Sequence, residues 1–292
     1  MSQEKFPHII LPSIHEEKLF TSIQQGSSKK RVPDRDCQSH ADFLRDKLTQ
    51  AWEEAENELV VAHSERNGIY LEFKGEPGFE LVTKSLEDMN SKKIRLCNVR
   101  YEDNCVINED TGKEEVLSTT YATVFVAKEK RQHFFEKIEK YATEIDERSD
   151  KPKNAKLIES ISEIKKAFVE SFWQDKEIPL PKDEPEWCEV WLSSDEHKII
   201  EKFERLLDEQ DITTKSGIIR FPERSVKVVY ASYSQLEKLI CLSDDIAEYR
   251  KAKNTASFWC SQTKREQAEW AKSLIERVNS PGLKAGACKS SS

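Results

Sequence analysis

The sequence predicts an α+β fold, because two stretches of the chain show the same order of elements. In each stretch a strand-like run is followed by a helix-like run, two further strand-like runs and a second helix-like run. The first stretch begins at Gly68 and the second at Glu186. This order is the βαββα arrangement of ferredoxin-like, or split βαβ, units. We therefore predict two ferredoxin-like units joined and flanked by helices, a topology that by itself fixes no function.

The composition is that of a polar globular chain with an acidic balance. A length of 292 residues corresponds to about two domains of ordinary size. The 54 acidic and 46 basic side chains give a net charge of −8. Sequence-independent binding to nucleic acid needs clustered Lys and Arg that displace counterions, so we expect no nucleic-acid partner.

The seven cysteines indicate reduced thiols rather than a disulfide framework. Their number is odd, and no pair has the Cys-x-x-Cys spacing. The first residues lack the apolar run of a secretory signal, and no stretch approaches the ~20 apolar residues of a membrane span. We therefore expect a cytoplasmic protein that has no membrane partner.

The chain begins with two segments outside the predicted units. Residues 1–38 are expected to form a flexible N-terminal segment, because they are polar around Gly26 and interrupted by Pro33. A helix is predicted over 39–67, where apolar residues recur at three- and four-residue spacing. Asp36 or Ser39 can cap its first turn, and Gly68 marks its end.

The first ferredoxin-like unit is predicted over 68–150. Residues 69–73 alternate as a half-buried strand, and apolar residues between 79 and 89 predict a helix. Further strands are predicted over 94–101 and 119–127, joined by a hydrophilic hairpin loop at 108–113. A closing helix carries apolar residues from Phe134 to Ile145 at helical spacing.

Residues 151–185 are predicted to connect the two units by a helix and a proline-rich linker. The helix is expected over 154–174, because one apolar stripe contains Leu157, Ile161, Ile164, Phe168 and Phe172. Three prolines follow between residues 178 and 185, a composition that is typical of a linker.

The second ferredoxin-like unit is predicted over 186–253. Strands are expected at 186–192, 217–221 and 225–231, with a tight turn at Pro222 between the last two. Helices are expected around 199–207 and from Ser234 onward. A C-terminal helix is predicted over 254–278, and a disordered tail over 279–292, where the residues are small and polar.

No arrangement of residues predicts catalysis. The sequence contains neither a Gly-x-Ser-x-Gly elbow nor a glycine-rich phosphate loop, and its His, Cys and carboxylate groups lack metal-ligand spacing. We therefore predict no catalytic residue, no metal site and no cofactor. No RNA-recognition signature accompanies the strand aromatics, so core packing is the preferred interpretation of Tyr70, Phe73, Phe125 and Trp191.

Several segments together resemble a known family. They read RVPDRD at 31–36 with Ser39 and His40 downstream, GIYLEFKGEPGFEL at 68–81, KSLED at 84–88, RFPER at 220–224, and DDIAE at 244–248 followed by RKAK at 250–253. In this order they resemble the N-terminal, non-catalytic region of bacterial subtilisin-like (S8 family) serine proteases. Members of that family are encoded beside an AAA ATPase, in modules of plasmid maintenance and phage defence. The resemblance covers about residues 29–278.

The resemblance does not carry a catalytic residue into this chain. In the family, a protease domain follows and its catalytic Asp stands in an Asp-Thr-Gly motif after an apolar strand. Here the triplet that begins at Asp110 is flanked by charged residues, which is the setting of a solvated hairpin turn. The resemblance therefore implies that this chain corresponds to the non-catalytic half of such a protease.

The resemblance also implies partners and contact residues. The partners are a subtilase catalytic domain and a neighbouring AAA ATPase, and subtilase propeptides are themselves ferredoxin-like, with a sheet that packs on the enzyme. The candidate partner-contact residues in the matching segments are Arg31, Arg35, His40, Arg220 and Arg224. Local capping, surface salt bridging and plain hairpin positions are the alternative interpretations of these five residues.

Three functional hypotheses follow. The leading one is a regulatory or propeptide-like N-terminal region of a cytoplasmic subtilisin-like protease, which lacks the catalytic domain and mediates protein–protein contacts. The second is a free-standing interaction or protease-inhibitor protein. The third is a small-molecule sensor, which would need a polar pocket between the paired units.

Overall fold

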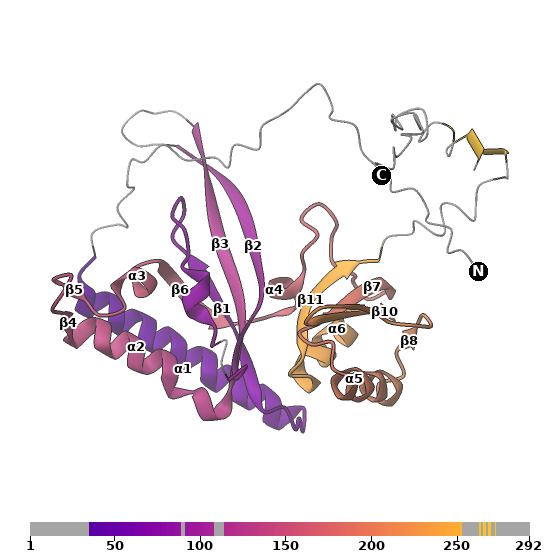
Figure 1. Ribbon diagram of the computed structural model, residues 1–292, viewed down its shortest axis with the longest axis horizontal. Coiled ribbons are helices and arrows are strands. Elements are labelled where there is room, and N and C mark those ends of the chain that lie inside the picture. Colours follow the sequence, from indigo (N-terminus) through magenta and orange to yellow (C-terminus); the bar gives the residue numbers. More distant parts are fainter. Residues whose placement is uncertain are drawn as a thin grey trace, which may run out of the picture. The chain divides into compact units, whose positions relative to one another are not determined.

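Two antiparallel sheets, each with helices packed on it, form the part of the chain from residue 35 to residue 252 (Figure 1). The computed structural model describes residues 35–88, 91–107 and 114–252, together with 263, 265, 266, 268, 269 and 272. For residues 106, 107 and 115 only the backbone is described. The predicted combination of helices with antiparallel strands is confirmed in this part of the chain.

The first lobe contains helices and strands up to residue 172. Its elements are α1 (Cys37–Val61), β1 (Gly68–Gly75), η1 (Thr83–Leu86), β2 (Ile94–Ile107), β3 (Glu114–Ala127), η2 (Lys128–Lys130), α2 (Gln132–Thr143), β4 (Ile145–Asp146), β5 (Lys151–Pro152), α3 (Ala155–Ile158), β6 (Ile161–Lys166) and α4 (Val169–Phe172). Its main sheet has the order β2-β3-β1-β6, while β4 and β5 form a separate two-stranded pair. The strands predicted at 68–73, 94–101 and 119–127 are confirmed, and the last two pair as a hairpin. The closing helix is confirmed from Phe134 to Thr143, whereas Ile145 lies beyond its end in β4 and is exposed.

The second lobe runs from residue 186 to residue 251. Its elements are β7 (Glu186–Leu192), α5 (His197–Glu209), β8 (Thr213–Thr214), β9 (Ile219–Phe221), β10 (Arg224–Ala231), α6 (Tyr233–Leu242) and β11 (Ile246–Lys251). The sheet order is β11-β7-β10-β8, and β9 pairs with β10 through the predicted tight turn at Pro222 and Glu223. The strand β11 was not predicted from the sequence.

Both main sheets share one strand order. When the short strand β9 is left out of the count, the first strand of each sheet in chain order lies between the third and the fourth, and the second lies beside the third. Every pairing within the two sheets is antiparallel. The two lobes are therefore similar in the topology of their main sheets, although the first has no helix between its first two strands.

The helices α1 and α2 lie side by side on one face of the first sheet (Figure 1). The strands contribute alternate residues to this face, among them Ile69, Leu71 and Phe73 of β1. The helix α1 contributes a stripe at three- and four-residue spacing that includes Leu44, Leu48 and Trp52, all at most 1% exposed. These residues form one continuous apolar core.

The helix α1 begins slightly earlier and ends earlier than the sequence predicted. Its N-cap is Asp36, which is one of the two predicted caps. The Asp36 carboxylate accepts a hydrogen bond from the Ser39 backbone N–H at 2.8 Å. The helix ends at Val61 instead of at residue 67. A flexible N-terminal segment was predicted over 1–38. Its residues 1–34 lie outside the described residues, and its last two residues, Cys37 and Gln38, belong to the helix.

The predicted helix between residues 79 and 89 is wrong. Only one 3₁₀ turn forms there, at Thr83–Leu86, while Leu81 and Leu86 are buried in the core. The face of the sheet that such a crossover helix would cover is already covered by α1 and α2. The segment therefore contributes its apolar side chains to the core without forming a helical layer of its own.

The predicted helix over 154–174 is also wrong, and so is the expectation that 151–185 only connects the two units. This stretch contains α3, the strand β6 and α4, and β6 is the fourth strand of the first sheet. Its pairing with β1 shifts register at Gly75, which leaves Ser162 as an extra residue. The bulge places Ile161 and Ile164 on one face although they are three residues apart, and this spacing imitates a helix.

Most of the predicted C-terminal helix over 254–278, the tail over 279–292 and the hairpin loop at 108–113 lie outside the described residues. The described positions 265, 266, 268, 269 and 272 are helical. The Thr263 hydroxyl accepts from the Glu266 backbone N–H, and the Glu266 carboxylate accepts from the Thr263 backbone N–H. This reciprocal pair is the capping box of a helix that starts after Thr263.

The close approach of strands at Gly68 generates a stability prediction. A Cβ at this position would lie 2.4 Å from Cζ of Phe125 and 2.5 Å from the Val126 carbonyl oxygen. Because a backbone atom cannot move aside cheaply, Gly68→Ala is expected to lower the free energy of unfolding by about 2 kcal/mol. Urea unfolding measures this change, with the exposed Glu147→Ala as the control. Equal midpoints for the two variants would contradict the prediction.

Candidate functional site

Arg35 and His40 lie at the start of α1 and bind within the first lobe. The Arg35 guanidinium contacts Nε2 of His40 at 2.7 Å, donates to the Ile161 carbonyl at 3.2 Å and forms an ion pair with Glu76. Burial, together with the positive charge of Arg35, lowers the pKa of His40. The two side chains thus tie the start of α1 to β6 and to the turn after β1, while Arg31 lies outside the described residues.

Arg220 and Arg224 lie on β9 and at the start of β10, in the second lobe. Arg220 is exposed and donates to the Asp195 carbonyl. Arg224 is half-buried and reaches across to β2, where its Nη2 donates to the Cys97 carbonyl at 3.0 Å. The four described candidates therefore contact different elements and do not form one site. Among them, Arg224 alone connects the two lobes.

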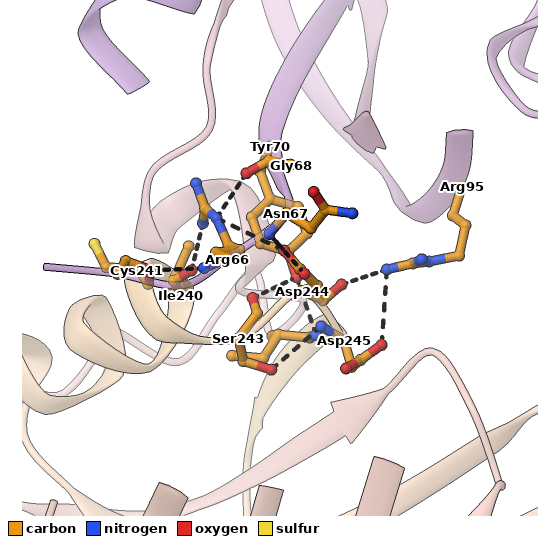
Figure 2. A network of polar contacts seen from close by, with 12 residues as sticks. Arg66, Asn67, Gly68, Tyr70, Arg95, Ile240, Cys241, Ser243, Asp244 and Asp245 are labelled. Carbon is orange, nitrogen blue, oxygen red and sulfur yellow. Dashed lines mark hydrogen bonds and ion pairs between the residues drawn. The ribbon is translucent and has the colours of Figure 1, made fainter. Parts of the chain in front are cut away.

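A partly buried polar network joins the lobes, and we call it the lobe junction (Figure 2). It consists of Arg66, Asn67, Tyr70 and Arg95 of the first lobe with Ser243, Asp244 and Asp245 of the second. The three residues of the second lobe lie between α6 and β11, in a segment that changes direction after the helix.

Arg66 is the most buried charge of the lobe junction, with a side chain that is 3% exposed. Its Nε donates to the Gly68 carbonyl at 2.9 Å, and its Nη1 donates to the Ile240 carbonyl at the end of α6. The guanidinium also lies 5.0 Å from the centre of the Tyr70 ring, and its Nε lies 4.0 Å from Oδ1 of Asp244. One side chain therefore satisfies acceptors in both lobes.

Tyr70 provides the central hydrogen bonds of the lobe junction. Its hydroxyl donates to the Ser243 carbonyl at 3.0 Å and accepts from the Ile246 backbone N–H at 3.1 Å. Its ring packs edge-on against Phe125 and Phe172. The apolar surroundings raise the pKa of the phenol far above its ordinary value, so Tyr70 remains a neutral donor.

The carboxylates of Asp244 and Asp245 are held differently. Asp244 accepts from the Asn67 backbone N–H at 2.9 Å, whereas the one described ion pair of Asp245 is the contact with Nη2 of Arg95 at 3.8 Å. Burial raises the pKa of Asp244, and the Asn67 hydrogen bond and Arg66 oppose the shift only in part. Burial likewise raises the pKa of Asp245, with Arg95 opposing and the neighbouring Asp244 adding to the shift.

A pocket of about 510 Å³ opens beside the lobe junction. Its walls come from the segment after α1, from one side of α5, and from the end of α6 with the segment that follows it. We call it the junction pocket, and its lining residues are His63, Glu65, Lys202, Phe203, Arg205, Leu206, Glu209, Gln210, Leu242, Ser243 and Asp245. No residue of the predicted first unit, 68–150, lines this pocket, so it is not the pocket between paired units that the sensor hypothesis required.

Aromatic side chains gather on the second sheet, on the face opposite α5 and α6. The two helices pack against Cys188, Val190 and Leu192 of β7, so the alternate residues Trp187 and Trp191 point to the other face. The register places Trp187 opposite Tyr230 of β10, and the rings of these two residues lie 5.1 Å apart. The interpretation of Trp191 as a core residue is therefore wrong, whereas Tyr70, Phe73 and Phe125 are buried as predicted.

Cations cover parts of these rings. The indole of Trp191 stacks on Phe221 with an interplanar angle of 5°, and the Arg250 guanidinium lies 4.8 Å from the centre of the Trp191 ring. Lys215 Nζ lies 4.8 Å from the centre of the Trp187 ring. We call this surface the aromatic face, and it comprises Trp187, Trp191, Lys215, Phe221, Tyr230 and Arg250. Phe221 remains 44% exposed and Tyr230 39% exposed.

The described residues contain no group of three or more His, Cys, Asp or Glu side chains that could hold a metal ion. The five described cysteines, Cys37, Cys97, Cys105, Cys188 and Cys241, are free thiols. Within the same residues no helix combines the length and apolar character that crossing a bilayer demands. The triplet at 110–112 lies outside the described residues.

Sequence reasoning did not identify the junction pocket or the aromatic face as sites. The sequence did contain a signal for the aromatic face, because apolar residues alternate with Trp187, Glu189 and Trp191. This alternation places both indoles on the side of the strand opposite the apolar residues. For the pocket no local signal existed, since its residues come from segments as far apart as His63 and Asp245, which only the packing of the lobes brings together. A comparison of the chain with protein-family models, curated proteins and solved structures finds no match.

The hydrogen bonds of Arg66 generate a second prediction. Arg66→Met keeps the aliphatic length but leaves the Gly68 and Ile240 carbonyls and the Asp244 carboxylate without this partner. The free energy of unfolding is expected to fall by about 3 kcal/mol. Urea unfolding followed by circular dichroism measures the change. The exposed Arg148→Met is the control, and a loss no larger than that of the control would show that Arg66 does not hold the lobes together.

Asp245 generates a prediction about pH. Because its pKa is raised by folding, the folded chain holds a proton on this carboxyl more tightly than the unfolded chain does. Its contribution to the free energy of unfolding therefore decreases as pH rises from the unfolded pKa of about 3.9 through the raised value. The Asn side chain of Asp245→Asn does not titrate. The free energy of unfolding of this variant minus that of wild type is therefore expected to increase as the pH is raised from about 4 to about 7.

Urea unfolding of both proteins at a series of pH values measures this difference. Asp208→Asn, an exposed substitution on α5, is the control that removes the same charge without burial. A difference between Asp245→Asn and wild type that is flat or falls with pH would contradict a raised pKa at Asp245.

Proposed function

We propose that this chain is a non-catalytic, propeptide-like regulatory region that binds the catalytic domain of a cytoplasmic subtilisin-like protease. The aromatic face is the observation that carries this proposal, because it offers a partly exposed set of large rings on a rigid sheet. The segments that resemble the N-terminal region of such proteases supply the identity of the partner. A neighbouring AAA ATPase is a second partner, which rests on the resemblance alone.

We further propose that each lobe is a ferredoxin-like unit. The shared strand order and the antiparallel pairing of both sheets support this assignment. In the first unit the crossover helix is reduced to the turn η1, and α1 takes its place on the sheet. A propeptide-like unit that binds through the free face of its sheet needs that face to be accessible.

The two sheets differ in this respect. The second face of the first sheet is buried, since Tyr70, Phe125 and Cys97 on it are at most 3% exposed and pack with residues of α4 and the second lobe. The aromatic face of the second sheet keeps its exposure. Partner binding through a sheet is therefore assigned to the second lobe.

The composition of the aromatic face fits a protein better than a nucleic acid. Trp, Tyr and Arg are the residues that most often dominate binding energy at protein interfaces. The cations Lys215 and Arg250 are balanced by Glu189 and Glu248, and Arg250 forms an ion pair with Glu248 at 2.7 Å. A surface without excess positive charge lacks the counterion release on which nucleic-acid binding depends. A free-standing inhibitor would use the same face, and the gene context distinguishes it from a protease region.

The aromatic face generates a binding prediction. The full chain is expected to form a complex with the catalytic domain of a subtilase from the resembling family. Phe221→Ser combined with Tyr230→Ser should weaken that complex by about tenfold or more, because interface aromatics contribute most of the binding energy. The control is Phe43→Ser on α1, where the same residue type is 43% exposed, almost as much as Phe221.

Biolayer interferometry with the immobilised catalytic domain measures the affinity of the three proteins. No complex with wild type would remove the subtilase as the partner. A complex that the double variant and the control weaken equally would keep the partner but remove the aromatic face as its binding surface.

A further inference from the structure

The junction pocket has the dimensions and the position of a small-ligand site. Its volume of about 510 Å³ falls within the range of about 300–1,000 Å³ that is usual for such sites. It has walls from both lobes, since His63 and Glu65 follow α1 whereas Lys202 and Asp245 belong to the second lobe.

Asp245 provides an acceptor with unused capacity in this pocket. Its side chain is 14% exposed, and among the described residues no N–H or O–H group donates a hydrogen bond to its carboxylate. Its one described ion-pair contact, to Arg95, is long at 3.8 Å. A ligand that carries an ammonium group would form a charge-assisted hydrogen bond with this carboxylate.

The opposite charge lies on α5, which also lines the pocket. The charge of Lys202 acts on Asp245 and opposes the rise of the pKa of that carboxyl. Lys202 and Arg205 are exposed there, and within the described residues Lys202 forms no ion pair. The apolar side chains of Phe203, Leu206 and Leu242 lie among these polar groups and can accommodate a hydrocarbon portion.

The mixture of charges selects the class of ligand. A nucleotide or another multiply charged anion would meet the carboxylates of Asp245, Glu65 and Glu209. A polyamine would meet Lys202 and Arg205, as well as His63 when that ring is protonated. A small molecule with one positive and one negative group satisfies both sides without an uncompensated charge.

We propose that the junction pocket binds a small zwitterion of the α-amino acid class. Its ammonium group contacts Asp245, its carboxylate contacts Lys202 and Arg205, and its side chain lies against Leu206 and Leu242. These contacts all belong to the second lobe, and Asp245 is also a member of the lobe junction (Figure 2), so the ligand stabilises the folded chain by mass action.

The test uses the full chain and the twenty proteinogenic amino acids, supplied one at a time. Differential scanning fluorimetry identifies those that raise Tm, and isothermal titration calorimetry measures their Kd. At least one amino acid is expected to bind with saturation, while acetate and ethylamine, which carry one charge each, should bind more weakly. If no amino acid raises Tm or gives saturable heat at millimolar concentration, the proposal is overturned.

Three variants locate the site. Asp245→Asn and Lys202→Met are each expected to weaken binding by about tenfold, since each removes one charge-assisted contact. Asp208→Asn, which removes a carboxylate of α5 that does not line the pocket, should bind like wild type. Unchanged affinity in both pocket variants would place the amino acid elsewhere. Circular dichroism and the Tm without ligand show that Lys202→Met, whose side chain is exposed, keeps the fold even if Asp245→Asn does not.

Discussion

The burial of Tyr70 between the lobes is the contact on which the rest of the structure depends. A four-stranded sheet with helices on one side leaves its second face to be covered, and Tyr70 lies on that face of β1, at 1% exposure. A phenol buried so completely needs partners for its hydroxyl, and the Ser243 carbonyl and the Ile246 N–H provide them. The second lobe therefore provides the contacts that the second face of the first sheet needs, and the two lobes are not independent domains.

A buried ion-pair cluster lies on the same face, further along the sheet. Glu72 is fully buried and contacts Arg100 at 2.6 Å and Lys165 at 3.0 Å. Burial alone would raise the pKa of this carboxyl, but the two cations outweigh it and hold the pKa below its ordinary value. Such a cluster contributes modestly to stability, because desolvation offsets much of the attraction. Its larger effect is to disfavour any arrangement in which α4 does not cover it, since Thr123 on this face donates to the Ser171 carbonyl of α4.

The sequence predicted most elements of the fold and few of the sites, for identifiable reasons. Periodicity located α1, α2 and the central strands, because each has a clear apolar side. It failed at β6, where the bulge at Ser162 gives a strand the spacing of a helix. It also assigned Trp191 to the core, although the alternation along β7 contained the correct answer. The lobe junction could not be derived, because Arg66 and Asp244 are ordinary charged residues until tertiary packing buries them together.

The two proposed sites share a structural element. The strand β11 starts directly after Asp245, which lines the junction pocket, and it carries Glu248 and Arg250 beside Trp191 on the aromatic face. A ligand that fixes the start of β11 therefore acts on the strand that positions Arg250. If the ligand and the partner prefer the same position of β11, each must raise the affinity of the other by the same factor, since binding free energies are reciprocally linked. The fold thus contains one physical element through which a small molecule at the lobe junction can regulate protein binding on the opposite side of the second sheet.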